Sequence, residues 1–303
     1  MLPRMSSPRQ RAHHIVRFTT HDDDLIPAIA DFVSDGVRLG ERVALVITPE
    51  HWTAVESLLV ERHVRIHAAL KHHQVVVTPV EDALAHVVVD GRPDPLRFQA
   101  LAEGILDAME PPVRVFGELA PRIAEIDIGA ALEIERLGER LAVEAGVNIL
   151  CAYHLDHLKA GHVDRVCNAH DAAVAGGGRP AHLAPIVLLA DDFHDGRELY
   201  EEYLRHKGYQ VVSARDGLDA ISLARLARPA VMLLDVRMPR MSGLEAMQIL
   251  KKDGDFRGTP IVALTAHALD AEREMFLASG FDEVLAKPIM PADVAQAVER
   301  LLN

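Results

Sequence analysis

Four apolar segments in the C-terminal part of the chain each end in side chains that carry chemistry. Asp191 and Asp192 follow residues 186–190, Asp235 follows residues 231–234, Thr265 follows residues 261–264, and Lys287 follows residues 284–286. Short apolar runs bounded by turn residues are typical of buried parallel strands, and the carboxyl ends of such strands meet at one edge of an open sheet. We therefore expect three carboxylates, a hydroxyl and an ammonium group to converge there.

These groups together could bind a divalent cation and a phosphoryl group. Three carboxylates in a partly buried crevice repel one another unless a cation neutralises them, and oxygen ligands with open positions suit Mg²⁺, which keeps several waters. The cation then attracts a phosphate. Asp235 is best placed to attack the phosphorus and form an acyl phosphate. Mg²⁺ and Lys287 would neutralise the transferring oxygens, and the Thr265 hydroxyl would donate a hydrogen bond to one of them.

The C-terminal stretch, about residues 185 to 303, resembles the receiver domain of two-component response regulators. The resemblance rests on the acidic pair at 191–192, LLDVRMPRMSG around Asp235, ALTAHA around Thr265 and AKP around Lys287. A buried strand that ends in a helix-capping aspartate would account for the second motif alone. It would not account for the acidic pair, the threonine and the Lys-Pro at three other strand ends.

The resemblance implies a flavodoxin-like (βα)5 fold and a role for each acidic residue. Asp235 would be the phosphoacceptor and one of the residues at the metal. Asp192 would be the more direct carboxylate ligand of Mg²⁺, and Asp191 would act partly through water. The backbone carbonyl of Arg237 would complete the protein ligands.

The resemblance also implies which residues surround the phosphoryl group. Thr265 and Lys287 would contact it, and Ala266 would leave room for it. Many receiver domains carry Tyr or Phe three residues before the Lys-Pro, but this chain has Val284 there. We therefore expect no two-position aromatic switch, so that the loop and helix after Thr265 relay phosphorylation. Phe281 is interpreted as core packing.

The length and composition of the whole chain indicate two globular domains. The 303 residues are 49% hydrophobic, which is enough for a core in each domain. The formal net charge is −13 and no Lys/Arg-rich block is present, so nucleic-acid binding is disfavoured. No apolar run has the length of a membrane span, and two cysteines do not make a disulfide framework. We expect a soluble cytoplasmic protein with neither kinase nor DNA-binding output.

One glycine-rich segment predicts the domain boundaries. Residues 176–182, GGGRPAH, are the clearest linker in the chain, and they are too short to let two domains diffuse freely. We predict an N-terminal domain at residues 1–174, a linker at 175–184 and the receiver domain at 185–303.

The N-terminal domain also alternates predicted strands and helices. Strands are expected at residues 14–18, 43–47, 75–78, 113–116 and 148–153. Helices are expected at residues 25–39, after Pro49, at 95–109, at 119–146 with a break at 127–129, and at 163–174. Residues 19–24 are interpreted as an N-terminal helix cap, and Gly40 as a helix end. The pattern predicts a parallel sheet covered by helices.

The first turn of this domain does not suit a nucleotide. A phosphate-binding loop requires glycines and a lysine at the helix N-terminus, as in GxxxxGK[ST]. The turn instead holds Asp22, Asp23 and Asp24. Three carboxylates favour a helix N-terminus but repel a triphosphate, so ATP hydrolysis is disfavoured.

The N-terminal domain resembles the MEDS sensory domain over about residues 12 to 172. The resemblance rests on six segments in succession, HHIVRFTTHDD, GERVALVITPEH, VVDGRPDPLRF, VRVFGELA, ALEIERLGERLA and ILCAYHL. It implies a RecA-like α/β sandwich that derives from an ATPase and has lost the phosphate loop. It also implies a role in sensing small molecules such as hydrocarbon derivatives.

Several polar residues of this domain have two interpretations. Glu118 follows a predicted strand and could contact a ligand, but a helix-start carboxylate is favoured because acids are common there. Five His and Cys residues close together could suggest a metal, namely His154, His157, His162, Cys167 and His170. They lack the compact spacing of structural zinc sites, so a metal is disfavoured. Cys151 is interpreted as a buried core residue.

These features predict a non-enzymatic signalling protein. Its expected partners are a histidine kinase or phosphotransfer protein, a downstream protein, and a small-molecule ligand of the N-terminal domain. The resemblance is compatible with a homodimer through the last two receiver helices and the strand between them. In an alternative, the N-terminal domain is a small-molecule or degenerate nucleotide-binding sensor that the receiver only gates. A third hypothesis is a metal-responsive switch that uses the histidines near residue 160.

Overall fold

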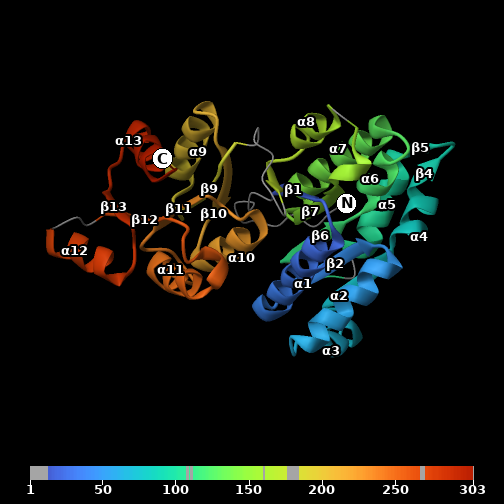
Figure 1. Ribbon diagram of the computed structural model, residues 1–303, viewed down its shortest axis with the longest axis horizontal. Coiled ribbons are helices and arrows are strands. Elements are labelled where there is room, and N and C mark those ends of the chain that lie inside the picture. The colour runs from blue at the N-terminus through green and yellow to red at the C-terminus, as the bar shows by residue number, and fades with distance from the viewer. Residues whose placement is uncertain are drawn as a thin grey trace. The chain divides into compact units, whose positions relative to one another are not determined.

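The computed structural model of the protein describes residues 13–106, 109, 112–159, 161–175, 184–266 and 270–302. The chain divides between His170 and Asp171 into two compact units, which are described separately (Figure 1). Residues 176–183 of the predicted linker lie outside the described residues. None of the described helices combines the length and the apolar character that a bilayer crossing requires.

The first unit is built around a parallel sheet. Five strands of this unit lie in the order β3-β2-β6-β7-β1, and each neighbouring pair is parallel. They are β1 (His14–Thr19), β2 (Arg42–Ile47), β3 (Val75–Pro79), β6 (Val113–Gly117) and β7 (Asn148–His154). Parallel strands with both faces covered need no polar face, which explains the continuous apolar runs in the sequence.

Helices connect these strands. They are α1 (Asp22–Leu39), α2 (Pro49–Glu61), α3 (Ile66–Lys71), α4 (Val80–Val87), α5 (Pro95–Leu106), α6 (Leu119–Ala124), α7 (Ile128–Ala145), η1 (Leu155–His157) and α8 (His162–Cys167). A short antiparallel pair, β4 (Val88–Val89) and β5 (Arg92–Pro93), lies between α4 and α5 in the chain. Strands and helices alternate as predicted, whereas the RecA-like assignment of this unit stays a prediction.

Local sequence signals set several helix ends. Gly40 follows α1 in the left-handed region at φ 73°, which glycine adopts without strain. Asp127 caps α7 by accepting hydrogen bonds from the amides of Gly129 and Ala130. A break in the long helix is therefore confirmed, but it lies at residues 125–127 and not at 127–129. α1 begins at Asp22 and has no side-chain cap. The acidic residues therefore occupy its first turn instead of capping it, at the positive end of the helix dipole.

One predicted element is wrong. The helix expected at residues 163–174 is only the short α8, and Ala172–Ala175 forms strand β8. Periodicity does not separate a short buried strand from a buried helix segment, and the run of small apolar residues at 172–175 fits both.

The second unit contains a five-stranded parallel sheet in the order β10-β9-β11-β12-β13. The strands are β9 (Ile186–Ala190), β10 (Gln210–Ala214), β11 (Val231–Asp235), β12 (Ile261–Thr265) and β13 (Glu283–Ala286). The helices are α9 (His194–His206), α10 (Gly217–Ala227), α11 (Gly243–Lys252), η2 (Gly254–Phe256), α12 (Asp270–Ser279) and α13 (Pro291–Leu302). Numbered within this sheet, the strand order is 2-1-3-4-5, which confirms the predicted flavodoxin-like fold.

The core of this unit brings the strand ends to one level. β9, β11 and β12 are buried along their whole length. The register pairs Leu234 with Ala190 and Asp235 with Leu264. A Cβ atom at Gly243, where α11 begins, would collide with the backbone carbonyl of Asp235, so glycine permits this close packing. The strand order reverses between β9 and β11, where doubly wound sheets open a ligand crevice outside their carboxyl ends.

Candidate functional site

Side chains from three strand ends meet in the second unit. Lys287, directly after β13, places its Nζ 2.6 Å from Asp191 Oδ2 and 2.5 Å from Asp235 Oδ2. Asp191 follows β9, and Asp235 is the last residue of β11. The two aspartates lie 96 and 52 positions from Lys287 in the chain, so parallel packing of the strands brings the three together. Charge-assisted hydrogen bonds from one ammonium group hold both carboxylates.

Asp191, Asp192 and Asp235 form an acidic cluster. One carboxylate oxygen from each residue lies within 4.8 Å of the other two. Asp191 and Asp235 are buried and Asp192 is exposed, so the cluster opens toward solvent. Carboxylate oxygens with access to water are the donors that Mg²⁺ prefers. The residues therefore fit the predicted ion.

Backbone amides orient the two buried carboxylates. The amide of Phe193 donates to Asp191 Oδ1 at 2.9 Å, and the amide of Arg237 donates to Asp235 Oδ1 at 3.0 Å. In both residues the second oxygen, Oδ2, faces Lys287. The backbone of Arg237 thus lies beside the site, and its role as a carbonyl ligand stays a prediction.

Burial and charge act in opposite directions on the acidity of the two central groups. Burial raises the pKa of Asp235 above its ordinary value, and the hydrogen bond from Lys287 offsets this only in part. Burial alone would lower the pKa of Lys287, but hydrogen bonds to Asp191 and Asp235 outweigh it and raise the pKa. Lys287 is therefore an ammonium group, and Asp235 is a poorly solvated and thus basic carboxylate.

The hydroxyl residue of the site stands on the neighbouring strand end. Thr265 is the last residue of β12 and is buried. It pairs with Ala286 of β13, and the amide of Lys287 donates to the Thr265 carbonyl at 2.7 Å. Thr265 and Lys287 therefore lie on adjacent strand ends, as the sequence predicts. Ala266 follows as an exposed residue, and residues 267–269 of the predicted relay loop lie outside the described residues.

In the first unit, Glu118 contacts the start of a neighbouring helix. Glu118 is buried and is the N-cap residue of α6, yet its side chain accepts no hydrogen bond from the backbone of that helix. Its carboxylate accepts a hydrogen bond from the amide of Thr48 at 2.7 Å and lies 2.5 Å from His51 Nδ1. The position matches the interpretation as a helix-start carboxylate, but the helix that Glu118 contacts through these residues is α2.

We expect Glu118→Gln to lower the pKa of His51. The hydrogen bond to Glu118 is the main cause that raises this pKa above its ordinary value of 6.5, and glutamine removes the negative charge. An NMR titration of the His51 ring measures the change. A raised histidine pKa adds stability below the unfolded pKa, which is lost as pH rises through the folded pKa. The stability difference between the variant and the wild type should therefore shrink with rising pH.

The control for this experiment is Glu50→Gln. Glu50 is exposed and precedes His51 in the chain, but it is not among the groups that raise the His51 pKa. Its substitution should leave that pKa unchanged. An equal shift in both variants would mean that the contact with Glu118 does not control His51.

A second group of polar side chains is buried in the core of the first unit. It contains His14 on β1, Glu135 on α7, Cys151 on β7 and His170 after α8. Glu135 Oε2 lies 3.1 Å from His14 Nε2 and 3.3 Å from His170 Nε2, and it accepts a hydrogen bond from Cys151 Sγ at 3.4 Å. Glu135 Oε1 accepts a hydrogen bond from the Tyr153 hydroxyl at 2.5 Å. We call the first four residues the buried cluster.

The buried cluster holds Glu135 in its charged form. Burial would raise the pKa of Glu135, but the charge of His170 and the hydrogen bond from His14 outweigh burial and lower the pKa well below its usual range. Burial would likewise lower the pKa of His170, but the charge of Glu135 raises it to about 9. The carboxylate and the rings thus stabilise one another's charges.

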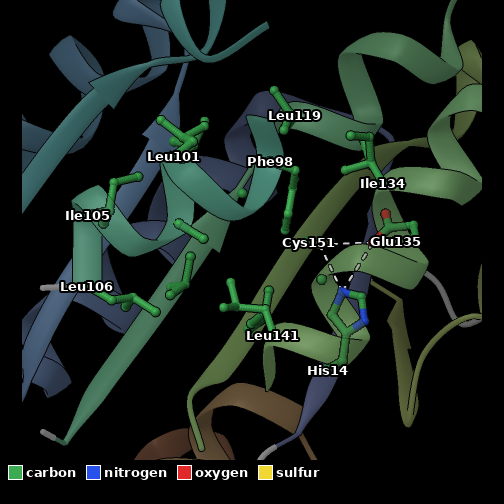
Figure 2. A pocket seen from close by; sticks show the side chains of 17 residues that line it. His14, Phe98, Leu101, Ile105, Leu106, Leu119, Ile134, Glu135, Leu141 and Cys151 are labelled. Atoms are coloured by element: carbon green, nitrogen blue, oxygen red, sulfur yellow. Dashed lines mark hydrogen bonds and ion pairs between the residues drawn. The ribbon is translucent and has the colours of Figure 1, made fainter. Parts of the chain in front are cut away.

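Three residues of the buried cluster form the polar end of an apolar cavity of about 80 Å³ (Figure 2). Among the cavity's lining residues, His14, Glu135 and Cys151 come from the cluster. The apolar lining includes Phe98, Leu101, Ile105, Leu106, Leu119, Ile134 and Leu141. Mostly apolar walls with a few polar groups are the usual character of a small-molecule site.

The His and Cys residues that suggested a metal in the sequence do not gather. Of those five, only His170 belongs to a group of potential ligand atoms in the described part of the chain, and its partners come from other elements. His154 and His157 instead stack on each other, with ring centroids 4.7 Å apart. Cys151 is buried as predicted, but its Sγ contacts His14 and Glu135, so it is more than core packing.

Comparison with known families covers both units. The model for MEDS, the MEthanogen/methylotroph, DcmR Sensory domain, matches residues 13–171, and the model for the response regulator receiver domain matches residues 187–299. The polar-differentiation response regulator DivK of Brucella anthropi is 34% identical over 117 residues, which are 39% of this chain and 95% of DivK. The chain belongs to both families. We therefore call the two units the MEDS domain and the receiver domain.

Solved structures are similar to part of the chain. The chemotaxis response regulator CheY4 of Vibrio cholerae is 31% identical, with a TM-score of 0.38 over 39% of this chain and 99% of CheY4. The receiver domain of the sensor histidine kinase PA1611 from Pseudomonas aeruginosa is described with a magnesium ion in its active site cleft. It is 33% identical, with a TM-score of 0.37 over 39% of this chain and 98% of its own.

The receiver domain has an aliphatic residue where many relatives carry an aromatic one. Val284, on β13, is buried. Phe281 is also buried and meets Phe276 edge to face, with ring centroids 6.1 Å apart, so its interpretation as core packing is confirmed. The absence of a two-position aromatic switch stays a prediction.

Sequence reasoning missed His14 and Glu135 in the MEDS domain. Both lie in segments that periodicity assigns correctly to a strand and a helix. They also lie in two of the segments that carry the MEDS resemblance, HHIVRFTTHDD and ALEIERLGERLA, but no spacing within either segment indicates that the two residues meet. A usable signal was the position of Glu135 between Ile134 and Leu137 on the buried face of α7. A carboxylate at a core position needs hydrogen bonds or a cation, because an unpaired buried charge is costly.

Proposed function

We propose that this chain is a two-component signalling protein whose receiver domain accepts a phosphoryl group on Asp235 in the presence of Mg²⁺. One observation carries the proposal. Lys287 Nζ lies between the carboxylates of Asp191 and Asp235, at 2.6 and 2.5 Å, and Asp192 adds a third carboxylate to the same cluster. Membership of the response regulator receiver family supports the same function.

Asp235 is the nucleophile in this proposal. A carboxylate oxygen attacks the phosphorus of the donor, the new O–P bond makes an acyl phosphate, and the bond from phosphorus to the leaving group breaks. The bonding electrons depart with the leaving group. Access favours Asp235 over Asp191, because its side chain is 11% exposed and that of Asp191 is only 1% exposed.

The groups around Asp235 would stabilise the transferred phosphoryl group. Lys287 offsets its negative charge, the Thr265 hydroxyl donates a hydrogen bond to one oxygen, and the small Ala266 side chain leaves room. The Mg²⁺ ligands would be the three carboxylates of the acidic cluster and the backbone carbonyl of Arg237. When bound, the ion supplies positive charge that draws in the phosphate and neutralises its oxygens.

Phosphorylation would act through protein contact. It adds roughly two negative charges next to Thr265, which biases the segment leading to α12 and alters a binding face. The proposed partners are a histidine kinase or phosphotransfer protein as donor and a downstream protein as receptor. The face formed by α12, β13 and α13 is a candidate for homodimerisation, and Met275 and Leu277 of α12 are exposed apolar residues. We propose no enzymatic or nucleic-acid-binding activity.

We propose that the MEDS domain senses a small apolar molecule. The support is its apolar cavity of about 80 Å³. An engineered apolar cavity of about 150 Å³ binds benzene, so the ligand would be smaller than benzene unless the cavity expands. The cavity also favours the second candidate function, in which the MEDS domain is the active part and the receiver domain only gates it.

Labelling with acetyl phosphate tests the proposed function. We expect the 303-residue chain to gain a single phosphoryl group when Mg²⁺ is present and none in excess EDTA, because uncompensated carboxylates repel the donor. Intact-protein mass spectrometry measures the gain. Restoring Mg²⁺ in excess over EDTA should restore labelling. Labelling that persists without divalent cations would contradict the role given to the acidic cluster.

A further inference from the structure

We propose that His14, Glu135, Cys151 and His170 bind a Zn²⁺ ion inside the MEDS domain. The four residues come from β1, α7, β7 and the turn after α8, and their potential ligand atoms all lie within 4.8 Å of one another. This site is separate from the Mg²⁺ site of the receiver domain and does not depend on the proposed phosphorylation.

The spacing of the ligand atoms fits a tetrahedral ion. Zn²⁺ bonds of about 2.0–2.3 Å place neighbouring ligand atoms roughly 3.3–3.8 Å apart at the corners of a tetrahedron. His14 Nε2 lies 3.1 Å from Glu135 Oε2 and 3.4 Å from Cys151 Sγ, and Cys151 Sγ lies 3.4 Å from Glu135 Oε2. His170 Nε2 lies 3.3 Å from Glu135 Oε2. These four distances need changes of only a few tenths of an ångström, and the two remaining pairs, which join His170 to His14 and to Cys151, lie within 4.8 Å.

In both histidines, the ring nitrogen that would not bind the ion lies beside a hydrogen-bond acceptor, as it does in metal-binding histidines. His170 Nδ1 lies 2.7 Å from the carbonyl oxygen of Val166. A carbonyl only accepts hydrogen bonds, so Nδ1 carries the proton and a neutral ring would present the lone pair of Nε2 to the ion. His14 Nδ1 lies 3.4 Å from the Glu139 carboxylate. Carboxylates and carbonyls in these positions orient metal-binding imidazoles.

Charge balance also favours a divalent ion. The side chains of His14 and His170 are fully buried and that of Glu135 is 2% exposed. A carboxylate, a thiolate and two neutral imidazoles around Zn²⁺ have no net charge. Without an ion, one protonated imidazole balances the charge of Glu135, and protonation of both His14 and His170 would place two cationic rings with centroids 4.1 Å apart, where they repel each other. Mixed imidazole, thiolate and carboxylate donors are typical of Zn²⁺ and unsuited to Mg²⁺ or Ca²⁺.

The position of the site gives it a functional consequence. His14, Glu135 and Cys151 line the apolar cavity, so an ion held there would face it (Figure 2). The same ion would join two strands, a helix and the segment after α8. Loading or loss of the ion would therefore change both the cavity and the core of the MEDS domain.

Metal titration of the 303-residue chain tests the proposal. We expect protein purified without chelators to contain stoichiometric Zn²⁺ by elemental analysis. After the metal is removed, Co²⁺ should give a thiolate-to-cobalt charge-transfer band in the near ultraviolet, and Zn²⁺ should abolish that band. Cys151→Ser should lose the band. Cys167→Ser is the matched control, since Cys167 is the other free cysteine and lies outside the cluster, and it should keep the band.

A second variant covers the case in which Cys151→Ser does not fold. Glu139 is 42% exposed, so Glu139→Gln should fold and should weaken Zn²⁺ binding about 10–100-fold by removing the negative charge beside His14 Nδ1. The proposal is overturned if the stripped wild-type protein gives no cobalt–thiolate band, or if Cys167→Ser loses it while Cys151→Ser keeps it. Labelling of Asp235 by acetyl phosphate should be unchanged in Cys151→Ser, so the two proposals can fail separately.

Discussion

Replacement of Asp235 by asparagine is expected to abolish labelling by acetyl phosphate while the protein stays folded. The amide of asparagine is not a nucleophile, and no other carboxylate in the described residues combines contact with Lys287 and an accessible side chain. Burial raises the pKa of Asp235 in the folded protein. A carboxylate with a raised pKa opposes folding above its unfolded pKa, so the neutral variant should be as stable as the wild type at neutral pH, or more stable.

Intact-protein mass and thermal unfolding are the two readouts for Asp235→Asn. Asp195→Asn is the matched control, because Asp195 lies in the first turn of α9 and its side chain is 85% exposed. This control should be labelled like the wild type. A phosphoryl group that is still gained by a folded Asp235→Asn protein would place the acceptor elsewhere.

Replacement of Glu135 by leucine is expected to cause the largest loss of stability. Its carboxylate is the common partner of His14, Cys151, His170 and Tyr153 in the core of the MEDS domain. Removing one member of a buried charged group costs about 3–5 kcal/mol, because the remaining members are left without their partner. This loss of stability comes from the contacts among the side chains and does not require a bound metal. It should therefore also be measured in buffer that contains a chelator.

Urea unfolding measures this loss, and Trp52 reports it specifically. Trp52 is the sole tryptophan of the chain and lies on α2 of the MEDS domain, so its fluorescence follows that domain. Glu133→Leu is the control on the same helix, because Glu133 is exposed, and it should change the free energy of unfolding by no more than about 0.5 kcal/mol. Equal effects of the two substitutions would show that the buried cluster does not stabilise the domain.

The receiver site shows how far local patterns can predict a functional site. Each of its residues ends or directly follows a short apolar run, and the sequence alone predicts that these runs are strands. Parallel strands deliver their carboxyl ends to one edge, so the approximate meeting place of Asp191, Asp235 and Lys287 follows from the chain alone. Two features could be known only from the packed sheet. They are the hydrogen bonds of Lys287 to both carboxylates and the contrast between buried Asp191 and exposed Asp192.

The MEDS domain shows where such patterns stop. Its strands and most of its helices follow from periodicity, but the helix predicted at residues 163–174 is in part strand β8. The metal site considered from the sequence consisted of His and Cys residues that are close together along the chain. The actual partners of His170 are His14 and Glu135, which are distant in sequence and meet only when β1 packs against α7.

The sequence by itself determined the two families, the alternation of strands and helices, and the acidic, hydroxyl and ammonium groups at the receiver strand ends. These depend on residue type and short-range spacing, which local physics controls. The tertiary structure alone decided the buried cluster, the apolar cavity behind it and the contact of Glu118 with α2. Each of these joins side chains from elements far apart in the chain, and their meeting depends on strand order and packing that no local pattern specifies.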